Sequence, residues 1–270
     1  MLRIYGQTDD IDASLNLATQ LIKDGNANSY VYFIAGVSLS HEKKYDDAIP
    51  LLKKSLSLRD TSLVFNQLGL CYQRKKRYDL AILYYEKGLD KEQMQSDYYE
   101  SYIALTNLGM CYHELKDYQT ALKNFDRALK IKPDFLNALI NLANLKEKLN
   151  LNTDAIEILK IALKHYPEDY FLHYTIGTLY QFLGDFKNSH FHYQKSLSIN
   201  PGHTEIYRLM SMTKKFREND KDFEIFKNKL KDKNLNEVKK MHLYFALGKA
   251  FDDIKDFDNS FLNYKKGNDI

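Results

Sequence analysis

The residues best suited to chemistry in this chain of 270 amino acids are a few histidines and paired acidic residues. His190 and His192 stand two positions apart in a segment with helical periodicity, so their side chains point to different faces and cannot share a metal ion. Acidic pairs occur at 46–47 and 252–253. General acid–base catalysis needs carboxylates that face each other across a pocket, so we interpret these pairs as solvated charges at helix ends.

Sequence motifs of known catalytic and cofactor sites are absent from the chain. It has no HExxH, CxxC or GxSxG sequence and no glycine-rich loop of the GxGxxG or GxxxxGKS/T type. Its two cysteines, Cys71 and Cys111, lie in equivalent expected helices, which pack roughly 8–10 Å apart. A disulfide needs Cα atoms within about 7 Å. We therefore expect buried thiols in a reducing, cytoplasmic compartment, no metal, no cofactor, and no enzymatic activity for the chain as given.

The elements that position these residues are pairs of helices, and residues 102–135 show the pattern most clearly. Apolar residues recur there at spacings of three and four in two stripes, which is the period of an α-helix. Asp117 lies between the stripes, so the segment is predicted to fold as helix, turn, helix. Pro133 ends the second helix because proline has no N–H to donate and clashes with the preceding turn. The stripes are Leu105, Leu108 and Tyr112, and Ala121, Phe125 and Ala128.

This pattern recurs along almost the whole chain. The gaps between successive small residues at its eighth position are 33, 40, 34, 34, 34 and 37 residues. A helix–turn–helix unit of 34 residues with small residues at fixed positions resembles the tetratricopeptide repeat. The small residues remove bulk where two helices cross, and large side chains such as Phe125 at position 24 are expected to lean onto the following repeat. The eighth position holds Gly36, Gly69, Gly109, Ala143, Gly177, Ser211 and Gly248.

The resemblance implies an all-α fold, a right-handed superhelical solenoid of helix-turn-helix tetratricopeptide repeats, each burying its apolar face on its neighbours. We expect about fifteen helices, no strand, and a single solenoid over 1–270. Its predicted parts are a leading half-repeat or cap helix in 1–28, five repeats in 29–203, a degenerate repeat in 204–240 and a truncated final repeat in 241–270. The early helices are predicted near 9–24, 29–42, 45–58, 62–75 and 78–95, with six extra residues near 91–99.

Charge and hydropathy argue against two classes of partner. The chain carries 39 basic and 36 acidic residues, a net charge of +3, which is too balanced for the concentrated basic face of a nucleic-acid-binding protein. No run of about 20 apolar residues occurs, so no membrane span is expected. Residues 1–25 lack a basic start followed by an apolar core, so no signal peptide is evident. A protein or peptide ligand is the partner we expect.

The resemblance also implies where a partner binds, because the first helices of such repeats line a concave surface. Positions 2, 5, 9 and 12 recur at three and four, so they share one face of the first helix. Asn107 and Asn141 at position 6 carry amides that can hydrogen-bond the backbone of an extended peptide. Apolar residues on this face are costly to leave in water, which favours binding over a bare solvated face. The candidate groove residues are Asn107, Met110, Asn141, Asn144, Glu147, Tyr174, Thr178, Gln181, Arg208, Met212 and Lys215.

The C-terminal part carries a second resemblance. Residues 241–268 are similar to the last repeat of bacterial tetratricopeptide-repeat sulfotransferases, and the lysine-rich stretch before them resembles the linker helix pair of that family. The resemblance implies that a sulfotransferase domain follows, whose phosphosulfate-binding loop contains a Pro-Arg-Ser-Gly-Thr-Thr type sequence. That sequence is absent from this chain, so no catalytic residue is carried over.

Three functions are therefore compatible with the sequence. In the first, the chain is a scaffold that binds a peptide or partner domain in its groove. In the second, it is the substrate-recruiting region of a bacterial sulfotransferase whose catalytic domain lies outside this chain. Glycosyltransferase-associated repeats share Asn107 and Asn141 but have asparagine at position 6 in other repeats as well. The groove does not match the two-carboxylate clamp of chaperone-binding repeats, which needs Lys and Asn at positions 5 and 9.

The last expected helix, near 257–267, carries large apolar side chains on more than one face. One preceding repeat cannot bury all of them, and a terminal repeat usually has a polar outer face. We therefore expect a surface that a following domain or a second copy of the chain covers, with self-association through this helix as one outcome. The side chains are Phe257, Phe261, Leu262 and Tyr264.

Overall fold

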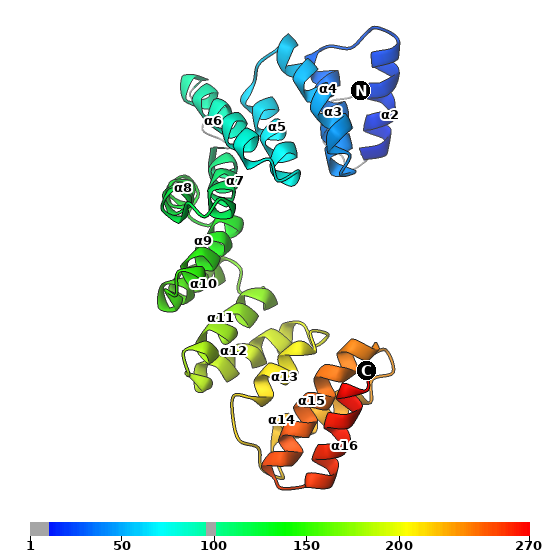
Figure 1. Ribbon diagram of the computed structural model, residues 1–270, viewed down its shortest axis with the longest axis vertical. Coiled ribbons are helices and arrows are strands. Elements are labelled where there is room, and N and C mark those ends of the chain that lie inside the picture. The colour runs from blue at the N-terminus through cyan, green and yellow to red at the C-terminus, as the bar shows by residue number, and fades with distance from the viewer. Residues whose placement is uncertain (1–10, 96–100) are drawn as a thin grey trace. The chain divides into compact units, whose positions relative to one another are not determined.

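The computed structural model describes residues 11–95 and 101–270, and within these ranges every regular element is a helix (Figure 1). The prediction of an all-α fold with about fifteen helices is confirmed for the part of the chain that the structure describes. The helices are α2 (Ile11–Lys23), α3 (Ser29–His41), α4 (Tyr45–Leu58), α5 (Ser62–Arg74), α6 (Tyr78–Gln95), α7 (Ser101–Glu114), α8 (Tyr118–Ile131), α9 (Leu136–Lys148), α10 (Asn152–His165), α11 (Tyr170–Phe182), α12 (Phe186–Ile199), α13 (Glu205–Ser211), α14 (Lys221–Leu230), α15 (Glu237–Asp253) and α16 (Phe257–Asn268).

The chain divides into two compact units, Met1–Leu145 and Lys146–Ile270. In the first unit, α3 packs along α4, α5 along α6 and α7 along α8, and α2 packs on α3. In the second unit, α11 packs along α12 and α15 along α16. Successive helices thus form antiparallel pairs. In the first unit each of these pairs packs on the next, and in the second unit α13 packs between α12 and α15 (Figure 1). None of the described helices is long and apolar enough to cross a membrane.

The tight turns between paired helices are built from a repeated backbone conformation. The residue two positions before the second helix adopts a left-handed conformation, which lets the chain leave the first helix sharply. Lysine takes this position four times, at roughly 1 kcal/mol each for the unfavourable Cβ contact. Aspartates then cap three of the second helices, α8, α12 and α16, as Asp117 does by accepting from the Thr120 N–H at 3.1 Å. The left-handed residues are Lys43, Lys76, Lys116, Asn150, Gly184 and Lys255.

Small residues at the eighth position of each repeat create room for a large side chain, as the sequence predicts. A Cβ atom added at Gly109 would lie 2.7 Å from the Phe125 ring, and one added at Gly177 would lie 2.7 Å from the Tyr193 ring. The prediction that position 24 leans onto the following repeat was incomplete, because Phe125 covers the glycine of its own repeat. The same pairs form between Gly36 and Leu52, Gly69 and Tyr85, and Gly248 and Tyr264.

The extra residues of the second repeat lengthen its second helix. Helix α6 has 18 residues, against 14 in α4 and α8. The prediction of a longer helix or loop near 91–99 is therefore confirmed as a longer helix as far as Gln95, and residues 96–99 lie outside the described ranges. The predicted leading helix at 9–24 is found as α2, with residues 9 and 10 outside the description.

The degenerate repeat departs from the pair pattern. Its first helix, α13, has only 7 residues, and the chain then runs without a helix to α14. Phe216 from this irregular stretch is 2% exposed and packs against Phe223 and Phe226 of α14. Helix α15 begins at Glu237, before the predicted start of the final repeat at 241, and Asn236 caps it by accepting from the Lys239 N–H at 2.9 Å. An aromatic cluster thus replaces the regular helix crossing here.

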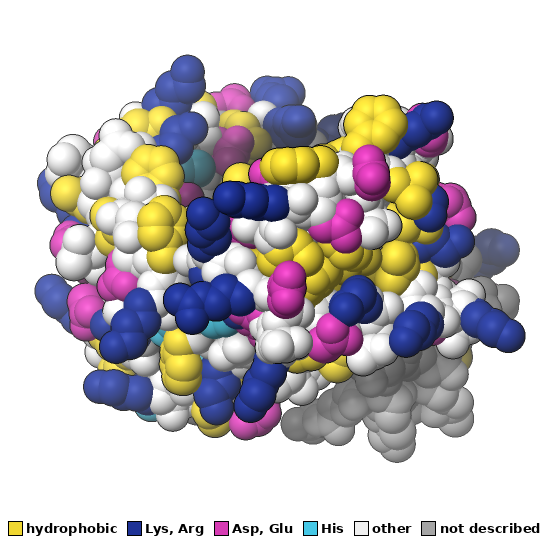
Figure 2. Space-filling model, turned by 90° about the horizontal axis from the view of Figure 1, so that it is seen from below, with side chains coloured by type: hydrophobic (Ala, Val, Ile, Leu, Met, Phe, Trp, Pro, Cys, Tyr) yellow, Lys and Arg dark blue, Asp and Glu magenta, His cyan; other side chains and the backbone are white. Residues whose placement is uncertain are grey.

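Lysine and arginine side chains are interspersed with acidic side chains on the face of the molecule in Figure 2. Helix α3 is nearly covered by its neighbours and buries Val31, Ile34 and Ala35.

The two cysteines, Cys71 and Cys111, are free thiols with fully buried side chains in the first unit. Their burial raises the pKa of both thiols, to about 12 for Cys111.

Candidate functional site

The first helices of three successive repeats in the first unit enclose a cleft of about 500 Å³. Helices α5, α7 and α9 each contribute one stripe of side chains to it, since residues three and four apart share a helix face. Three candidate groove residues, Asn107, Met110 and Asn141, meet in this cleft. It is lined by Leu70, Gln73, Arg74, Lys76, Tyr78, Ile103, Thr106, Asn107, Met110, Glu114, Phe135, Asn137 and Asn141.

One of the two asparagines in the cleft is held by an internal hydrogen bond. The Asn141 amide donates to the Asn137 carbonyl at 2.7 Å. A side-chain amide has two N–H donors and a carbonyl acceptor. Asn141 therefore keeps one donor and its acceptor for a ligand. Asn107 lies in the same lining, and the nearby Tyr85 hydroxyl donates to Oε1 of Gln73 at 2.8 Å.

Apolar and charged side chains occupy different parts of the cleft. Ile103 is 39% exposed, and Met110 and Phe135 are partly buried beside it. Arg74 is a cation in the lining, and Glu114 accepts from the Tyr78 hydroxyl at 3.4 Å. An apolar floor with a few fixed polar groups is the usual composition of a binding cleft. This arrangement can hold an extended segment through its backbone while burying an apolar side chain.

Comparison with protein families identifies the repeats. Family models described as tetratricopeptide repeat match residues 60–134, 112–174 and 172–203, which together span more than half of the chain. The chain belongs to the tetratricopeptide-repeat (TPR) family. No curated protein matches it.

Solved TPR structures share the fold at low sequence identity. The C-terminal part of a TPR repeat-containing protein from Cytophaga hutchinsonii is 14% identical, with 99% of this chain and 97% of that chain covered and a TM-score of 0.64. PilW, described as a type IV pilus biogenesis factor, is 18% identical, with coverages of 75% and 99% and a TM-score of 0.62. YrrB, described as a TPR protein with an unusual peptide-binding site, is 19% identical, with coverages of 69% and 93% and a TM-score of 0.51.

Two further candidate groove residues of the TPR chain lie on α9 but outside the cleft. Asn144 and Glu147 are exposed, and neither lines the space between α5, α7 and α9. Glu147 also falls beyond the end of the first unit. The cleft therefore brings together three of the five candidate residues of the third and fourth repeats.

In the second unit, α11 presents the candidates Tyr174, Thr178 and Gln181. Gln181 is part of the packing, because its Oε1 accepts from the Tyr193 hydroxyl at 2.7 Å. The Thr178 hydroxyl donates to the Tyr174 carbonyl at 3.1 Å. The Tyr174 ring lies 4.9 Å from that of His203, measured between centroids. These contacts order the α11 face and leave it partly exposed.

The remaining candidates are Arg208, Met212 and Lys215. The sequence predicts that they share one face of a helix, but the structure does not place all three on one helix. Arg208 lies on α13 and pairs with Glu205 at 3.5 Å. Helix α13 ends at Ser211, so Met212 and Lys215 follow it in irregular chain. The helix stops because the chain turns to bury Phe216, whose N–H donates to a carboxylate oxygen of Asp253 on α15 at 2.9 Å.

His190 and His192, two positions apart on α12, point to different neighbours, as the sequence predicts. His192 lies against His173, with their Nδ1 atoms 3.0 Å apart, whereas His190 contacts Thr213 and Asp222. Burial lowers the pKa of His192 to about 4, and the neighbouring His173 acts in the same direction. Among the described residues, no three His, Cys, Asp or Glu side chains cluster where they could hold a metal ion.

Asp222 anchors a buried polar network that the sequence did not reveal. Its carboxylate, 4% exposed, lies 2.5 Å from the Lys214 ammonium and 3.0 Å from Nε2 of His190. Burial alone would raise the pKa of Asp222, but the hydrogen bonds from His190 and Lys214 outweigh it and hold this pKa below the ordinary value. Its partners come from α12 and the irregular stretch, so no local sequence pattern signals the network.

Half of the cleft residues that were not named as candidates come from the second repeat. Leu70 and Gln73 occupy positions 9 and 12 of that repeat, so the periodic rule would have found them if it had been applied there. Tyr78 begins α6 and Phe135 directly precedes α9, so both lie outside the first helices to which the rule based on helical period applies.

Proposed function

We propose that this TPR chain is a non-catalytic interaction scaffold that binds an extended peptide segment of a partner protein in the cleft of α5, α7 and α9. The supporting observation is that the amides of Asn107 and Asn141 line the cleft together with the apolar side chains of Ile103 and Met110, and that a hydrogen bond to the Asn137 carbonyl holds Asn141 in place. Amides at this spacing can hydrogen-bond a peptide backbone whatever its sequence. The apolar floor adds affinity by removing an apolar side chain of the peptide from water.

The description of YrrB as a peptide-binding TPR protein is consistent with this proposal. Free, buried Cys71 and Cys111 support a cytoplasmic site of action, because thiols persist in reducing compartments. The partly exposed candidates Tyr174 and Arg208 are proposed as a separate contact surface of the second unit, with Thr178, Met212 and Lys215 nearby in the sequence.

A double substitution tests the cleft. A peptide selected from a random library against the intact chain should bind the Asn107→Ala/Asn141→Ala variant about tenfold or more weakly, from two lost hydrogen bonds. Asn144→Ala is a matched control on the same helix outside the cleft, and it should leave the affinity unchanged. Circular dichroism should show equal helicity for all three proteins. Equal binding by the double variant would contradict the proposal.

A second candidate function is that of the substrate-recruiting region of a sulfotransferase. The observation that favours it is the outer face of α16. Phe257 is 63% exposed and Phe261 is 71% exposed on this helix. In this candidate, a following sulfotransferase domain covers these rings and carries the chemistry. The coding sequence after Ile270 is the test. A phosphosulfate-binding loop of the Pro-Arg-Ser-Gly-Thr-Thr type supports the candidate, and a stop codon removes it.

Self-association through α16 is the alternative use of the same face. Burying two such rings on a second copy would contribute roughly 3–6 kcal/mol. Light scattering over a concentration series should then show a dimer for the parent chain and a monomer for Phe261→Lys/Leu262→Glu. A parent that stays monomeric at every concentration would contradict self-association.

A further inference from the structure

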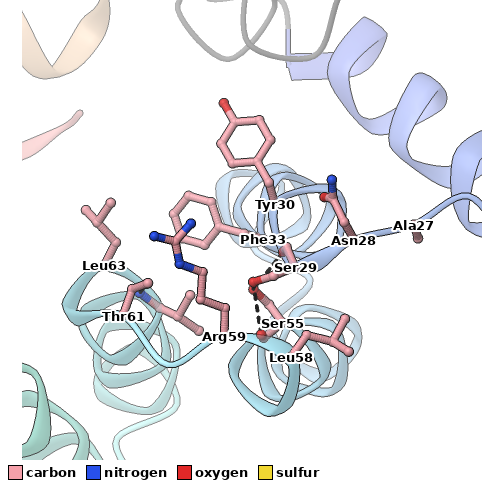
Figure 3. A pocket seen from close by; sticks show the side chains of 11 residues that line it. Ala27, Asn28, Ser29, Tyr30, Phe33, Ser55, Leu58, Arg59, Thr61 and Leu63 are labelled. Carbon is pink, nitrogen blue, oxygen red and sulfur yellow. Dashed lines mark hydrogen bonds between the residues drawn. The ribbon is translucent and has the colours of Figure 1, made fainter.

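A second cavity in the first unit, of about 630 Å³, lies apart from the cleft described above. It opens where α3 begins, α4 ends and α5 begins, so three helix ends meet around it (Figure 3). No residue of the α5–α7–α9 cleft lines it. Its lining consists of Ala27, Asn28, Ser29, Tyr30, Phe33, Ser55, Leu58, Arg59, Thr61, Leu63 and Val64.

The walls of this cavity expose an unusual amount of apolar surface to solvent. Tyr30 is 42% exposed, Leu58 51% and Leu63 47%. Phe33 forms the back of the cavity between them (Figure 3). Single exposed apolar side chains are ordinary, but several around one concavity favour a ligand that brings an apolar group of its own.

The cavity carries one charged side chain, the guanidinium of Arg59, which extends beside Phe33 toward Leu63 (Figure 3). Arg59 makes no ion pair with any residue that the structure describes. The nearest acidic residue in sequence, Asp60, is paired with Lys91 at 2.7 Å. No acidic side chain is present in the lining. Arg59 is therefore available to an anionic group, and its planar fork matches a carboxylate in a bidentate arrangement.

Two helix N-termini add to the positive potential of the cavity. Helix α5 begins beside it with Thr61 as its cap, whose hydroxyl accepts from the Val64 N–H at 3.4 Å. Helix α3 begins beside it with Asn28, whose side chain accepts from the Val31 N–H at 3.0 Å. A cap satisfies only one of the four free N–H groups of a helix start. The others, with the helix dipole, favour an anion near Arg59.

The floor of the cavity is rigid. The hydroxyl of Ser55 on α4 donates to the carbonyl of Ser29 on α3 at 2.8 Å, and the two hydroxyls lie 3.1 Å apart (Figure 3). These bonds fix the end of α4 against the start of α3. A preformed cavity avoids the ordering cost that weakens binding at mobile surfaces.

We propose that this cavity binds the C-terminal residue of a partner peptide. The last side chain, if apolar, fits between Tyr30, Leu58 and Leu63, and the terminal carboxylate pairs with Arg59 at the start of α5. A chain end places an apolar group and an anion on one Cα atom, which is the combination that the cavity offers. This site is additional to the peptide cleft of the proposed function and does not depend on it.

Two synthetic hexapeptide libraries test the proposal on the intact chain. One library has free C-terminal carboxylates and the other has C-terminal amides, and both carry random sequences. Affinity selection followed by mass spectrometry, in buffer of low ionic strength, should enrich peptides of the first library that end in Leu, Ile, Val or Phe. Their amidated forms should bind at least tenfold more weakly, because the pairing with Arg59 is lost. Equal enrichment of acids and amides would overturn the proposal, as would selection of internal Asp or Glu with tolerance of the amide.

Substitutions then locate the binding. Arg59→Gln should weaken the selected acids about tenfold, and Arg59→Lys should have an intermediate effect because it keeps the charge but not the fork. Leu63→Ser should also weaken binding. The side chains of Arg59 and Leu63 are both exposed, so folding should be unaffected by these substitutions. Asn141→Ala in the separate cleft is the control. Loss of binding in Asn141→Ala with none in Arg59→Gln would assign these peptides to the cleft and overturn the inference while leaving the proposed function in place.

Discussion

The Tyr193 hydroxyl donates a 2.7 Å hydrogen bond to Oε1 of Gln181, and the Tyr193 ring covers Gly177. The same arrangement recurs three repeats earlier, where Tyr85 covers Gly69 and donates to Gln73 at 2.8 Å. Each repeat of this type therefore locks its second helix to its first with one ring and one hydrogen bond. Gln73 also lines the binding cleft, so this one side chain takes part both in helix packing and in the candidate binding site.

The hydrogen bond in this arrangement should be measurable by a double-mutant cycle. Tyr193→Phe and Gln181→Ala should each lower the free energy of unfolding by about 0.5–1.5 kcal/mol, and the double variant should lose less than the sum. Urea unfolding of the four proteins gives the coupling energy. A coupling energy of zero would show that the bond contributes nothing to stability.

Bulk at the eighth position should destabilise the chain. In Gly109→Leu or Gly177→Leu the new side chain meets the ring that covers the glycine, so the expected loss is roughly 1–3 kcal/mol or more. Gly88→Ala is the control, because its Cβ would meet the movable side-chain oxygen of Asn66 and alanine favours the helix. Thermal unfolding compares the variants. Unchanged melting of both leucine variants would refute the packing role of these glycines.

Stability should fall with acidification between pH 6.5 and about pH 4 because of His192. Its pKa is lowered from 6.5 to about 4 by burial and by His173, so in this interval the unfolded chain binds a proton that the folded chain does not. Stability therefore rises with pH across this window. His192→Phe should lose less stability than the parent between pH 7 and pH 4.5, as measured by urea unfolding. The exposed His165→Gln should behave like the parent, and a His192→Phe profile identical to the parent's would contradict the assignment.

Asp222 should contribute stability at neutral pH that is lost only in acid. Its pKa in the folded chain lies below the ordinary value, so this contribution is present above about pH 4 and falls as pH drops further. Asp222→Asn should lower the free energy of unfolding at pH 7 by about 3 kcal/mol, because Lys214 and His190 lose a buried anionic partner. The exposed Asp258→Asn serves as control. A loss as small as that of the control would show that the network is not stabilising.

The regular repeats could be predicted from the sequence because each depends on local spacing. The helices predicted at 29–42 and 45–58 are found at Ser29–His41 and Tyr45–Leu58, since small residues and left-handed turns repeat at fixed positions. The early end of α13 could not be predicted in this way. It depends on the burial of Phe216 against α14 and on Asp253, which lies 37 residues further along the chain.

The candidate site was predictable where it follows helical period and not where helix ends converge. Asn107, Met110 and Asn141 meet in one cleft because they occupy equivalent faces of successive first helices. Arg59 stands at the end of α4 and gains its surroundings from α3 and α5. Tyr30, Phe33 and Leu63 occupy positions 2 and 5 of their repeats, so the periodic rule selects them, whereas it carries no signal for Arg59 and Leu58 at the end of α4.

Photo-crosslinking tests the central claim, peptide binding in the cleft of α5, α7 and α9, most directly. A peptide selected against the intact chain would carry a diazirine, and mass spectrometry would map its adducts after irradiation. We predict adducts on cleft residues such as Leu70, Met110 and Phe135, and their loss in the Asn107→Ala/Asn141→Ala variant. Adducts confined to the second helices α4, α6 and α8, unchanged in that variant, would contradict the account.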